Sequence, residues 1–473
     1  MNEETTGTSG PGAGSSERSD SPAVGAAPPA ETRETTLRGR ASKIGTFTCL
    51  GVRDFRLFWM GSVGSSVGQW QNSVTIGWVL YDLTGSATLL GLINGMRSFA
   101  MLGIGPIAGV VVDRMDRRIL LMATKVLLFT ASLVVGLLLA LDRMAMWHLF
   151  AFMFLFGVAQ AFDQPLRQTI VFDLVPRRLI PNAIALMTVA MNSTRPWAPA
   201  LAGFMIAWFG PEGNFFFQSA AYVGVLVTIL MMVFPRRGGV AKGGSVLHNF
   251  LEGLSYVVKE PTTRTFALLG LVPFILVIPV FNTLMPIFAK DVFHGGPQAL
   301  GILLGAIGIG GALGPLVSAS LVRFQRRGLL QIVTLLGMSI TLVGLGLTNS
   351  FYVAIFLMVL GGFCEMEYMT TNMTVLQLSI PDELRGRVTS VLMLRMGLMF
   401  LGALFAGVGA DLYGVKEIVV AMGGLTGVIA VLVALASPRV RHLRLSDVAP
   451  SAGAAGGPVV PAAVAGSGAA PPA

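Results

Sequence analysis

The chain has 473 residues, of which 53% are hydrophobic and only 12% are charged, and its mean hydropathy is +0.73. Soluble proteins carry about a quarter charged residues, so this composition excludes an ordinary soluble domain. The formal net charge of +9 does not indicate nucleic-acid binding, because the Lys and Arg residues concentrate in short segments between apolar runs.

The chain begins and ends with polar, low-complexity segments. Residues 1–50 are rich in Gly, Ser, Pro and Thr and lack the apolar stretch of a signal peptide, while residues 441–473 are rich in Ala, Pro and Gly. We predict that both are disordered cytoplasmic tails. Cys49 and Cys364 are far apart and have no metal-ligand neighbours, so we expect neither a disulfide nor a metal site.

Twelve apolar runs are long enough to cross a bilayer, which takes roughly 20 residues of helix. They predict an all-α polytopic membrane protein. The predicted transmembrane helices lie near residues 57–80, 88–112, 119–141, 148–172, 182–208, 215–234, 266–289, 299–322, 329–347, 352–379, 388–412 and 417–436. Within the fifth, Pro196 and Pro199 each remove a backbone donor, so we expect a kink there.

The longest polar break between spans divides the chain into two halves. We predict an N-terminal six-helix bundle over 51–235, a cytoplasmic linker over 236–264 and a C-terminal six-helix bundle over 265–440. Apolar residues in the linker recur at i, i+3, i+4 and i+7, which predicts an amphipathic helix at the membrane surface, ended by Pro261.

An internal repeat relates the two halves. VPRRLIPNAIAL (175–186) aligns with IPDELRGRVTSV (380–391) at an offset of 205, and Gly157 matches Gly362 at the same offset. Parallel six-helix repeats of this kind occur in membrane transporters. The sequence therefore predicts two six-helix pseudo-repeats.

Lys and Arg lie mainly on one side of the predicted bilayer. In the loops and flanking segments, twenty lie on the side of both termini, and three, Arg143, Lys290 and Lys416, lie on the other. By the positive-inside rule both termini are cytoplasmic, in a multi-pass protein of the cell membrane.

A short basic loop follows the second predicted span. Its sequence, GVVVDRMDRR (109–118), resembles the G-x-x-x-D-R-x-G-R-R loop of major facilitator superfamily transporters, with Asp116 where that family usually has Gly. The resemblance implies a cytoplasmic gate, in which the acidic residue contacts the far half. The implied gating residues are Gly109, Asp113, Arg114, Arg117 and Arg118. The second-half counterpart, LVRFQRR (321–327), lacks the acidic residue.

Further stretches resemble the drug-efflux, enterobactin-exporter and macrolide-efflux branch of that superfamily. They are residues 55–71, 157–176, 182–210 and 380–388. The resemblance implies a secondary active exporter that moves a small organic molecule (a drug, siderophore or other secondary metabolite) out of the cell by proton antiport and alternating access. It also implies a monomer without a cofactor, whose partners are the substrate, protons and the lipid bilayer.

Two alternatives stay open at this point. An importer or facilitator would have the same fold, and a non-transporting membrane receptor or a membrane enzyme is a different class of protein. No phosphate-binding G-x-x-x-x-G-K-[ST] sequence and no nucleophile–base arrangement is present in the chain, so an enzyme is not expected.

Ionisable residues inside the spans are costly and therefore point to function or to a partner. Asp163 and Arg195 lie at similar depths on consecutive spans, so we expect an ion pair, which either only neutralises the two charges or leaves Asp163 as a cavity-facing protonation site. Arg167, one turn from Asp163, competes for the carboxylate or reaches to the surface.

Two carboxylates lie in the tenth span. Glu365 and Glu367 point to nearly opposite helix faces, so only one is expected to face the cavity as a proton site, while the other meets a neighbour such as Arg395. The repeat aligns Glu367 with Asp163 at an offset of 204, which slightly favours Glu367. Tyr368 follows directly and is a further candidate for the cavity.

The remaining candidates are polar residues on other spans. Arg97 either attracts an anionic substrate or extends to the outer interface. The resemblance implies that spans 1, 4, 7 and 10 line the cavity, which makes Gln69, Asn72 and Asn282 candidates for hydrogen bonds to substrate. Hydrogen bonding between helices is the alternative role for these amides.

Overall fold

The computed structural model describes residues 47–233, 246–320, 326–381 and 383–443. Most of the predicted tails and much of the predicted linker lie outside these ranges. Residues 48–50, predicted to be disordered, form part of the helix η1 (Thr48–Gly51), in which Cys49 is buried. Contacts separate Met1–Thr48 from Cys49–Ala473, and the second unit contains every helix from α2 onward.

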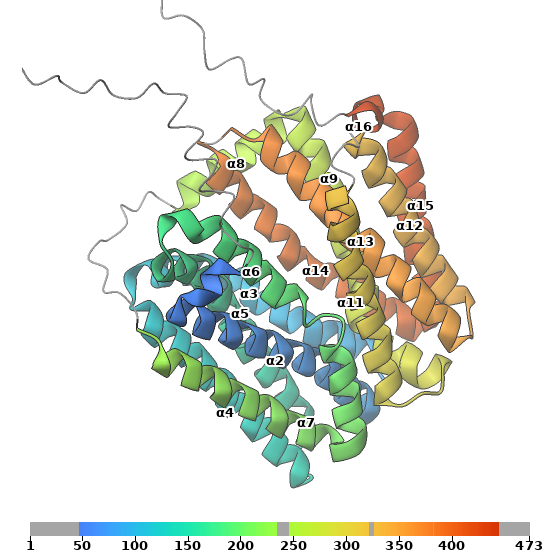
Figure 1. Ribbon diagram of the computed structural model, residues 1–473. Coiled ribbons are helices and arrows are strands. Elements are labelled where there is room, and N and C mark those ends of the chain that lie inside the picture. The colour runs from blue at the N-terminus through green and yellow to red at the C-terminus, as the bar shows by residue number, and fades with distance from the viewer. Residues whose placement is uncertain (1–46, 234–245, 321–325, 382, 444–473) are drawn as a thin grey trace, which may run out of the picture. The chain divides into compact units, whose positions relative to one another are not determined.

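The first half of the chain is helical and appears blue to green in Figure 1. Its elements are η1 (Thr48–Gly51), α2 (Arg53–Thr84), α3 (Ala87–Arg114), α4 (Arg117–Ala140), α5 (Met146–Leu174), η2 (Arg177–Leu179), α6 (Ile180–Asn192) and α7 (Ala198–Met231). Helix α7 contains the second part of the predicted fifth span and the described part of the sixth, because at Gly210 the backbone turns to a φ of 72° and Pro211 follows; α6 supplies the first part of the fifth span. The predicted break between the fifth and sixth spans is therefore a kink within one continuous element.

The second half is also helical and appears yellow-green to red in Figure 1. Its elements are α8 (Val246–Lys259), α9 (Pro261–Leu276), η3 (Val280–Leu284), α10 (Met285–Ile287), η4 (Phe288–Val292), α11 (Pro297–Ser320), α12 (Arg327–Leu347), α13 (Phe351–Ser379), α14 (Arg385–Tyr413), α15 (Val415–Ala436) and α16 (Pro438–His442). Elements α9 to η4 together form the predicted seventh span, which is continuous over Pro261–Val292.

The described residues of the predicted spans are mostly helical, and the fifth is interrupted by turns at 193–197. Ten helices of the described chain are long and apolar enough to cross a membrane, with α7 counted as one. Its second span brings the number to eleven, and α2, which is 32 residues long but rich in Gly, Ser and polar side chains, is the twelfth.

Matching glycines in the two halves allow matching helices to pack closely. A Cβ at Gly157 of α5 would lie 2.6 Å from the backbone oxygen of Arg97 on α3. Its repeat-mate Gly362 on α13 packs against the backbone of Ile307 on α11 in the same way. The repeat found in the sequence is thus a repeat in packing, because small residues let transmembrane backbones approach.

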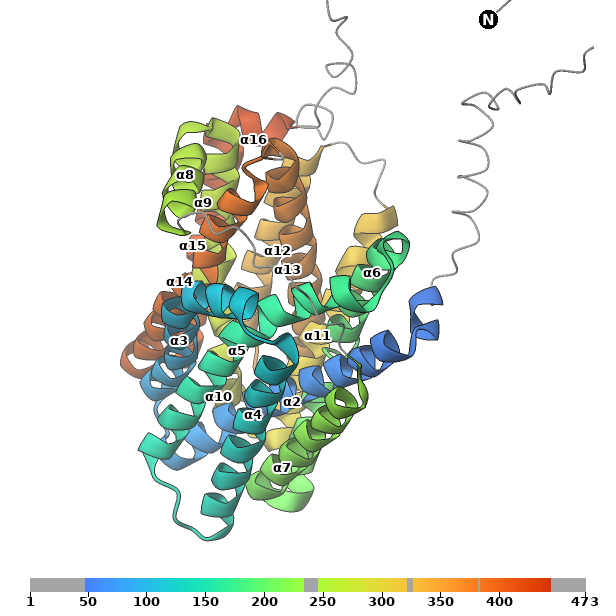
Figure 2. The same ribbon diagram turned by 90° about the vertical axis from the view of Figure 1, so that its left-hand side faces the viewer.

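The end of the helices that carries Arg53, Arg114 and Arg385 is called the basic end below, and the opposite one the distal end. The two halves pack tightly from mid-helix to the distal end. Helix α7 lies against α11, and α3 lies against α14, as Figures 1 and 2 show. A Cβ at Gly301 of α11 would lie 2.6 Å from the Pro199 backbone oxygen of α7.

Toward the basic end, the described part of the same helices is less closely packed. A Cβ added at Gly103, Gly105 or Gly109 of α3, or at Gly386 of α14, would meet no atom within 4 Å. The described contacts that hold the halves together are thus concentrated between mid-helix and the distal end.

Polar contacts join the halves at the distal end. Asp411 of α14 accepts hydrogen bonds from the backbone N–H groups of Ala87 and Thr88, both at 2.8 Å, and from the Ser86 hydroxyl at 2.9 Å. An acidic side chain thereby caps the N-terminus of a helix in the other half. In addition, Lys290 Nζ lies 2.6 Å from Asp82 Oδ1, and the Tyr81 hydroxyl donates to Asp291.

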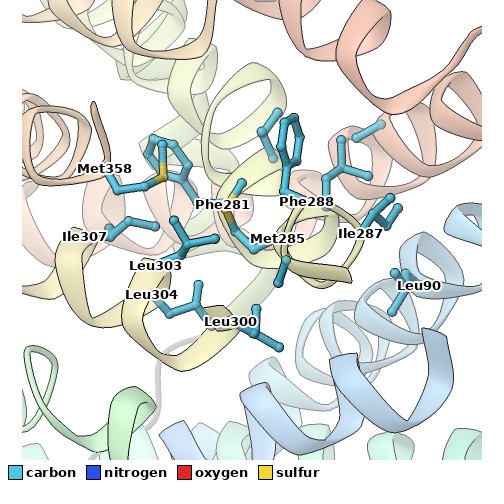
Figure 3. Close-up of a cluster of buried hydrophobic side chains, with 14 of the residues drawn as sticks. Leu90, Phe281, Met285, Ile287, Phe288, Leu300, Leu303, Leu304, Ile307 and Met358 are labelled. Carbon is cyan, nitrogen blue, oxygen red and sulfur yellow. The ribbon is translucent and has the colours of Figure 1, made fainter. Parts of the chain in front are cut away.

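A cluster of buried apolar side chains includes residues of both halves (Figure 3). Leu90 of α3 belongs to the same cluster as Phe281, Met285 and Phe288 of the seventh span, and all four are at most 2% exposed. Other members shown in Figure 3 are Ile287, Leu300, Leu303, Leu304, Ile307 and Met358. In a bilayer such a cluster stabilises by close packing, because lipid is equally apolar.

Helix α8 occupies the part of the linker where periodicity predicts a helix. It packs against the start of α14, where Arg387 pairs with Glu252 and a Cβ at Gly253 would overlap the Arg387 backbone. Pro261 is the first residue of α9, and Glu260 caps that helix by accepting from the Thr263 N–H. A location at the membrane surface stays a prediction.

Candidate functional site

A pocket lies between the two halves at mid-helix. Its cavity has room for about 20 Å³ of water-sized molecules, and its empty volume including space open to solvent is about 260 Å³. It is lined by Trp70 of α2, Arg195, Ile278, Phe281, Asn282, Leu304, Ile307 and Glu365. Apolar and aromatic walls with a few convergent polar groups are typical of small-molecule sites.

An ion pair across the halves is the main polar feature of this pocket. The Arg195 Nη2 atom donates to both carboxylate oxygens of Glu365, at 3.1 and 3.0 Å. The two side chains are 13% and 8% exposed. Because Arg195 belongs to the first half and Glu365 to α13 of the second, this pair exists only while the halves approach each other here.

The local sequence places Arg195 at a break in the helix. Helix α6 ends at Asn192 and α7 begins at Ala198, and the intervening residues form turns. Pro196 and Pro199 lack backbone donors, which explains the predicted kink. Helix α11 packs directly onto this break, since a Cβ at Gly305 would lie 2.7 Å from the Pro196 backbone oxygen.

Asp163 belongs to a different, fully buried network. Its carboxylate contacts Lys125 Nζ at 2.5 Å and Arg167 Nε at 2.6 Å. Arg167 also donates to the Ser62 backbone oxygen at 3.5 Å. The predicted pair of Asp163 with Arg195 is therefore wrong: both lie at similar depths, but they point in different directions around their helix axes.

Glu367 lies outside the pocket. It is 1% exposed, and the Thr371 hydroxyl donates to it at 3.4 Å. The preference for Glu367 as the cavity carboxylate is not supported by this arrangement, because Glu365 is the one that lines the pocket. The two side chains do point to different surroundings, as residues two apart on a helix must.

Arg395 and Tyr368 bind to groups within the second half. Arg395 Nη1 donates to Asn372 Oδ1 at 3.3 Å, and its guanidinium lies over the Phe274 ring. These contacts are with an amide and a ring, and the predicted pairing of Arg395 with a carboxylate of α13 stays a prediction. The Tyr368 hydroxyl donates to the Leu269 backbone oxygen at 2.7 Å, and Tyr368 is fully buried.

The candidate amides are distributed over different surroundings. Asn282 lines the pocket, and Gln69, next to Trp70, is half-buried. Asn72 is fully buried and its amide faces the Met153 sulfur of α5 at 3.6 Å. In this arrangement Asn72 lies between helices rather than at the pocket.

The basic loop after α3 makes contacts within the first half. Arg117 forms an ion pair with Asp173 of α5, and Arg118 Nη2 donates to the Leu230 backbone oxygen at 3.0 Å. Asp116 caps α4 by accepting from the Arg118 N–H at 2.8 Å, which gives a structural reason for an acid at this position. The side chain of Asp113 lies outside the described part of the chain, so its predicted gating contact stays a prediction.

Sequence reasoning missed three residues of these networks. Lys125 is a lysine within an apolar run and was identifiable by that fact alone, because a charge in hydrocarbon needs a partner. Asp411 lies at the end of a predicted span, where acidic residues are common. Its role becomes visible only from the neighbouring helix α3, which it caps. Trp70 resembles any other aromatic residue of a transmembrane helix.

Known proteins resemble the chain over most of its length. The sequence profile of a family described as transmembrane secretion effector matches residues 44–467. The staphyloferrin A transporter of Staphylococcus aureus is 24% identical, over 78% of this chain and 92% of that protein. Macrolide efflux protein A of Streptococcus pyogenes is 22% identical, over 83% of this chain and 97% of that protein.

A solved structure also matches. A bacterial homologue of the human lysosomal transporter Spinster superposes with a TM-score of 0.67 at 15% identity, covering 85% of this chain and 100% of that one. At this identity the likeness concerns the fold.

Proposed function

The chain belongs to the transmembrane secretion effector family of the major facilitator superfamily, and from that premise we propose that it exports a small organic molecule by proton antiport. The all-α major facilitator fold predicted from the sequence is confirmed, and the protein is a multi-pass membrane transporter rather than an enzyme. Export, proton coupling and a cytoplasmic basic end are the parts that we propose.

The observation that supports this proposal most is the Arg195–Glu365 pair, which joins the halves at the pocket. Alternating access requires the halves to separate at the distal end and approach each other at the basic end. That movement separates Arg195 from Glu365. A buried charge that loses its partner costs about 3–5 kcal/mol, so the separation needs either a proton on Glu365 or a substrate group in place of Arg195.

The need to neutralise Glu365 when Arg195 leaves it links proton movement to the opening and closing of the distal end. When the distal end opens, Glu365 has lost Arg195 and takes a proton from the outside. When the distal end closes, Arg195 returns to the carboxylate and the proton leaves through the basic end. With the basic end in the cytoplasm, protons move inward on the return step, and the substrate that replaced Arg195 on the outward step leaves the cell.

The test measures substrate-driven proton movement. In inside-out vesicles acidified by respiration, a substrate of an antiporter releases protons from the vesicle and restores the fluorescence of a quenched acridine dye. Erythromycin and staphyloferrin A are suitable probes, because the relatives are named for a macrolide and for this siderophore. We expect Glu365→Gln to reduce the fluorescence recovery at least about tenfold, the effect of roughly 1.4 kcal/mol or more.

Glu367→Gln is the matched control, since it makes the same change two residues away on α13. It should retain proton release. If Glu367→Gln abolishes release and Glu365→Gln does not, the coupling carboxylate is Glu367. If substrate accumulates in the vesicles equally after the proton gradient is collapsed, antiport is wrong and the chain is a facilitator.

A further inference from the structure

Arg97 is a cation that the described structure leaves without a partner. It lies in the middle of α3, and its guanidinium forms no hydrogen bond or ion pair with any described residue. Its Nε atom is buried without an acceptor. An uncompensated cation inside a transmembrane bundle costs several kcal/mol and marks a functional site.

The direction of Arg97 follows from its helical neighbours. Phe99, two residues later, is 63% exposed and therefore faces lipid. Two residues on a helix are separated by about 200°, so Arg97 points toward the interior. Asn94, one turn earlier on the same face, reaches Thr283 at 3.5 Å, and Thr283 directly follows the pocket residue Asn282.

The depth of Arg97 also matches the pocket. At 1.5 Å per residue, Arg97 lies about 25 Å from the basic end of its helix, Trp70 about 25 Å from the same end of α2, and Glu365 about 21 Å from that end of α13. Arg97 therefore lies at about the depth of the Arg195–Glu365 pair, on the interior side of α3, but is not itself among the residues that line the pocket.

The charged residues inside the spans include more cations than carboxylates. Away from the ends of the spans, five cations (Arg97, Lys125, Arg167, Arg195 and Arg395) accompany three carboxylates (Asp163, Glu365 and Glu367), an excess of two positive charges. The carboxylates of Asp163 and Glu365 already bind other cations, and Arg395 has an amide and a ring. Arg97 has none of these.

We propose that the substrate carries an anionic group, such as a carboxylate, and that Arg97 binds it. The proposal rests on the proposed transport function and names its substrate class. A guanidinium binds a planar oxyanion through two parallel hydrogen bonds.

The test measures the charge preference of the pocket without a known substrate. Cysteine is placed at Asn282 in a Cys49→Ala, Cys364→Ala background and the protein is reconstituted in phosphatidylcholine nanodiscs, which contain no anionic lipid. The reaction rates of an anionic and a cationic methanethiosulfonate reagent (the sulfonatoethyl and trimethylammonioethyl forms) are each divided by their rates with 2-mercaptoethanol. We expect the anionic reagent to be favoured, and Arg97→Gln to lower that preference about tenfold.

Two variants complete the test. Arg97→Lys keeps the charge and should keep the preference, and Arg143→Gln, at an exposed position, should not change it. Equal normalised rates for the two reagents, or a preference that Arg97→Gln leaves unchanged, would overturn the proposal. The outcome is independent of proton coupling, since a chain without antiport would still show the charge preference.

Discussion

Asp163 is a buried charge whose contacts favour a structural role over proton coupling. It is in contact with two cations, Lys125 and Arg167, and all three are less than 10% exposed. A carboxylate held by two cations does not release or accept protons easily, since protonation would leave both cations unneutralised. The Asp163 network therefore stabilises the first half, while Glu365 is the better candidate for proton coupling.

This assignment predicts the behaviour of Asp163→Asn. The substitution leaves Lys125 and Arg167 buried without a carboxylate, which should cost about 3–5 kcal/mol and lower both the yield and the unfolding temperature of the purified protein. The measurement is thermal unfolding in detergent, followed by size-exclusion chromatography. Adding Lys125→Met should recover part of the loss, because it removes one of the unneutralised charges.

Asp142→Asn, in an exposed turn, is the control and should unfold at the temperature of the unmodified protein. If Asp163→Asn also unfolds at that temperature but no longer transports, Asp163 is a proton site after all and the structural reading is wrong.

At the residue level, the sequence identifies the ionisable residues that make polar contacts inside the spans. It does not identify the side chains with which they pair. Asp163, Arg195, Glu365 and Arg395 all make polar contacts inside the spans, as their position in apolar runs indicates. Helical rise gives depth along the membrane normal, but the direction of a side chain around its helix depends on the rotation of that helix in the bundle. For this reason Asp163 and Arg195 match in depth and still do not meet.

At the level of helices, glycine determines where the halves meet. Gly203 of α7 and Gly301 of α11 face each other, and a Cβ at Gly301 would lie 3.1 Å from the Gly203 Cα. The contact leaves no room for a side chain while the distal end is closed. Opening of the distal end removes this restriction.

We therefore expect Gly301→Val to disfavour the closed distal end. Overpacking of this kind costs about 1–3 kcal/mol, so transport should fall between about fivefold and a hundredfold while the protein still folds. Gly224→Val is the matched control on α7, because a Cβ there meets nothing within 4 Å. Initial transport rates in vesicles, corrected for protein amount, give the comparison. Equal rates for the two variants would contradict this role of the interface.

The helices themselves are largely predictable, because apolar length alone identifies them. The offset of 205 also predicts a matched pair, Gly157 and Gly362, that packs equivalent helices together. The contacts between α7 and α11 and between α3 and α14 are not predictable in this way. They join segments about 100 and 300 residues apart, and the sequence contains only the small residues that permit them.

For the whole molecule, the described contacts represent one end of a cycle. The halves meet from mid-helix to the distal end, through Asp411, Lys290 and the Arg195–Glu365 pair, and pack less closely at the basic end. With the predicted topology this is a state open to the cytoplasm. We propose that the Arg195–Glu365 ion pair holds the distal end closed while Glu365 is charged.

The most direct measurement is the distance between spin labels at Leu83 and Tyr413, exposed positions at the distal ends of α2 and α14. In a background without Cys49 and Cys364, electron paramagnetic resonance should give a short distance at about pH 8 and a growing longer-distance population toward about pH 5, as protons bind. Glu365→Gln should give the longer-distance population at every pH, and Glu367→Gln should not. Distances that do not change with pH and are the same in Glu365→Gln and the unmodified chain would contradict the account.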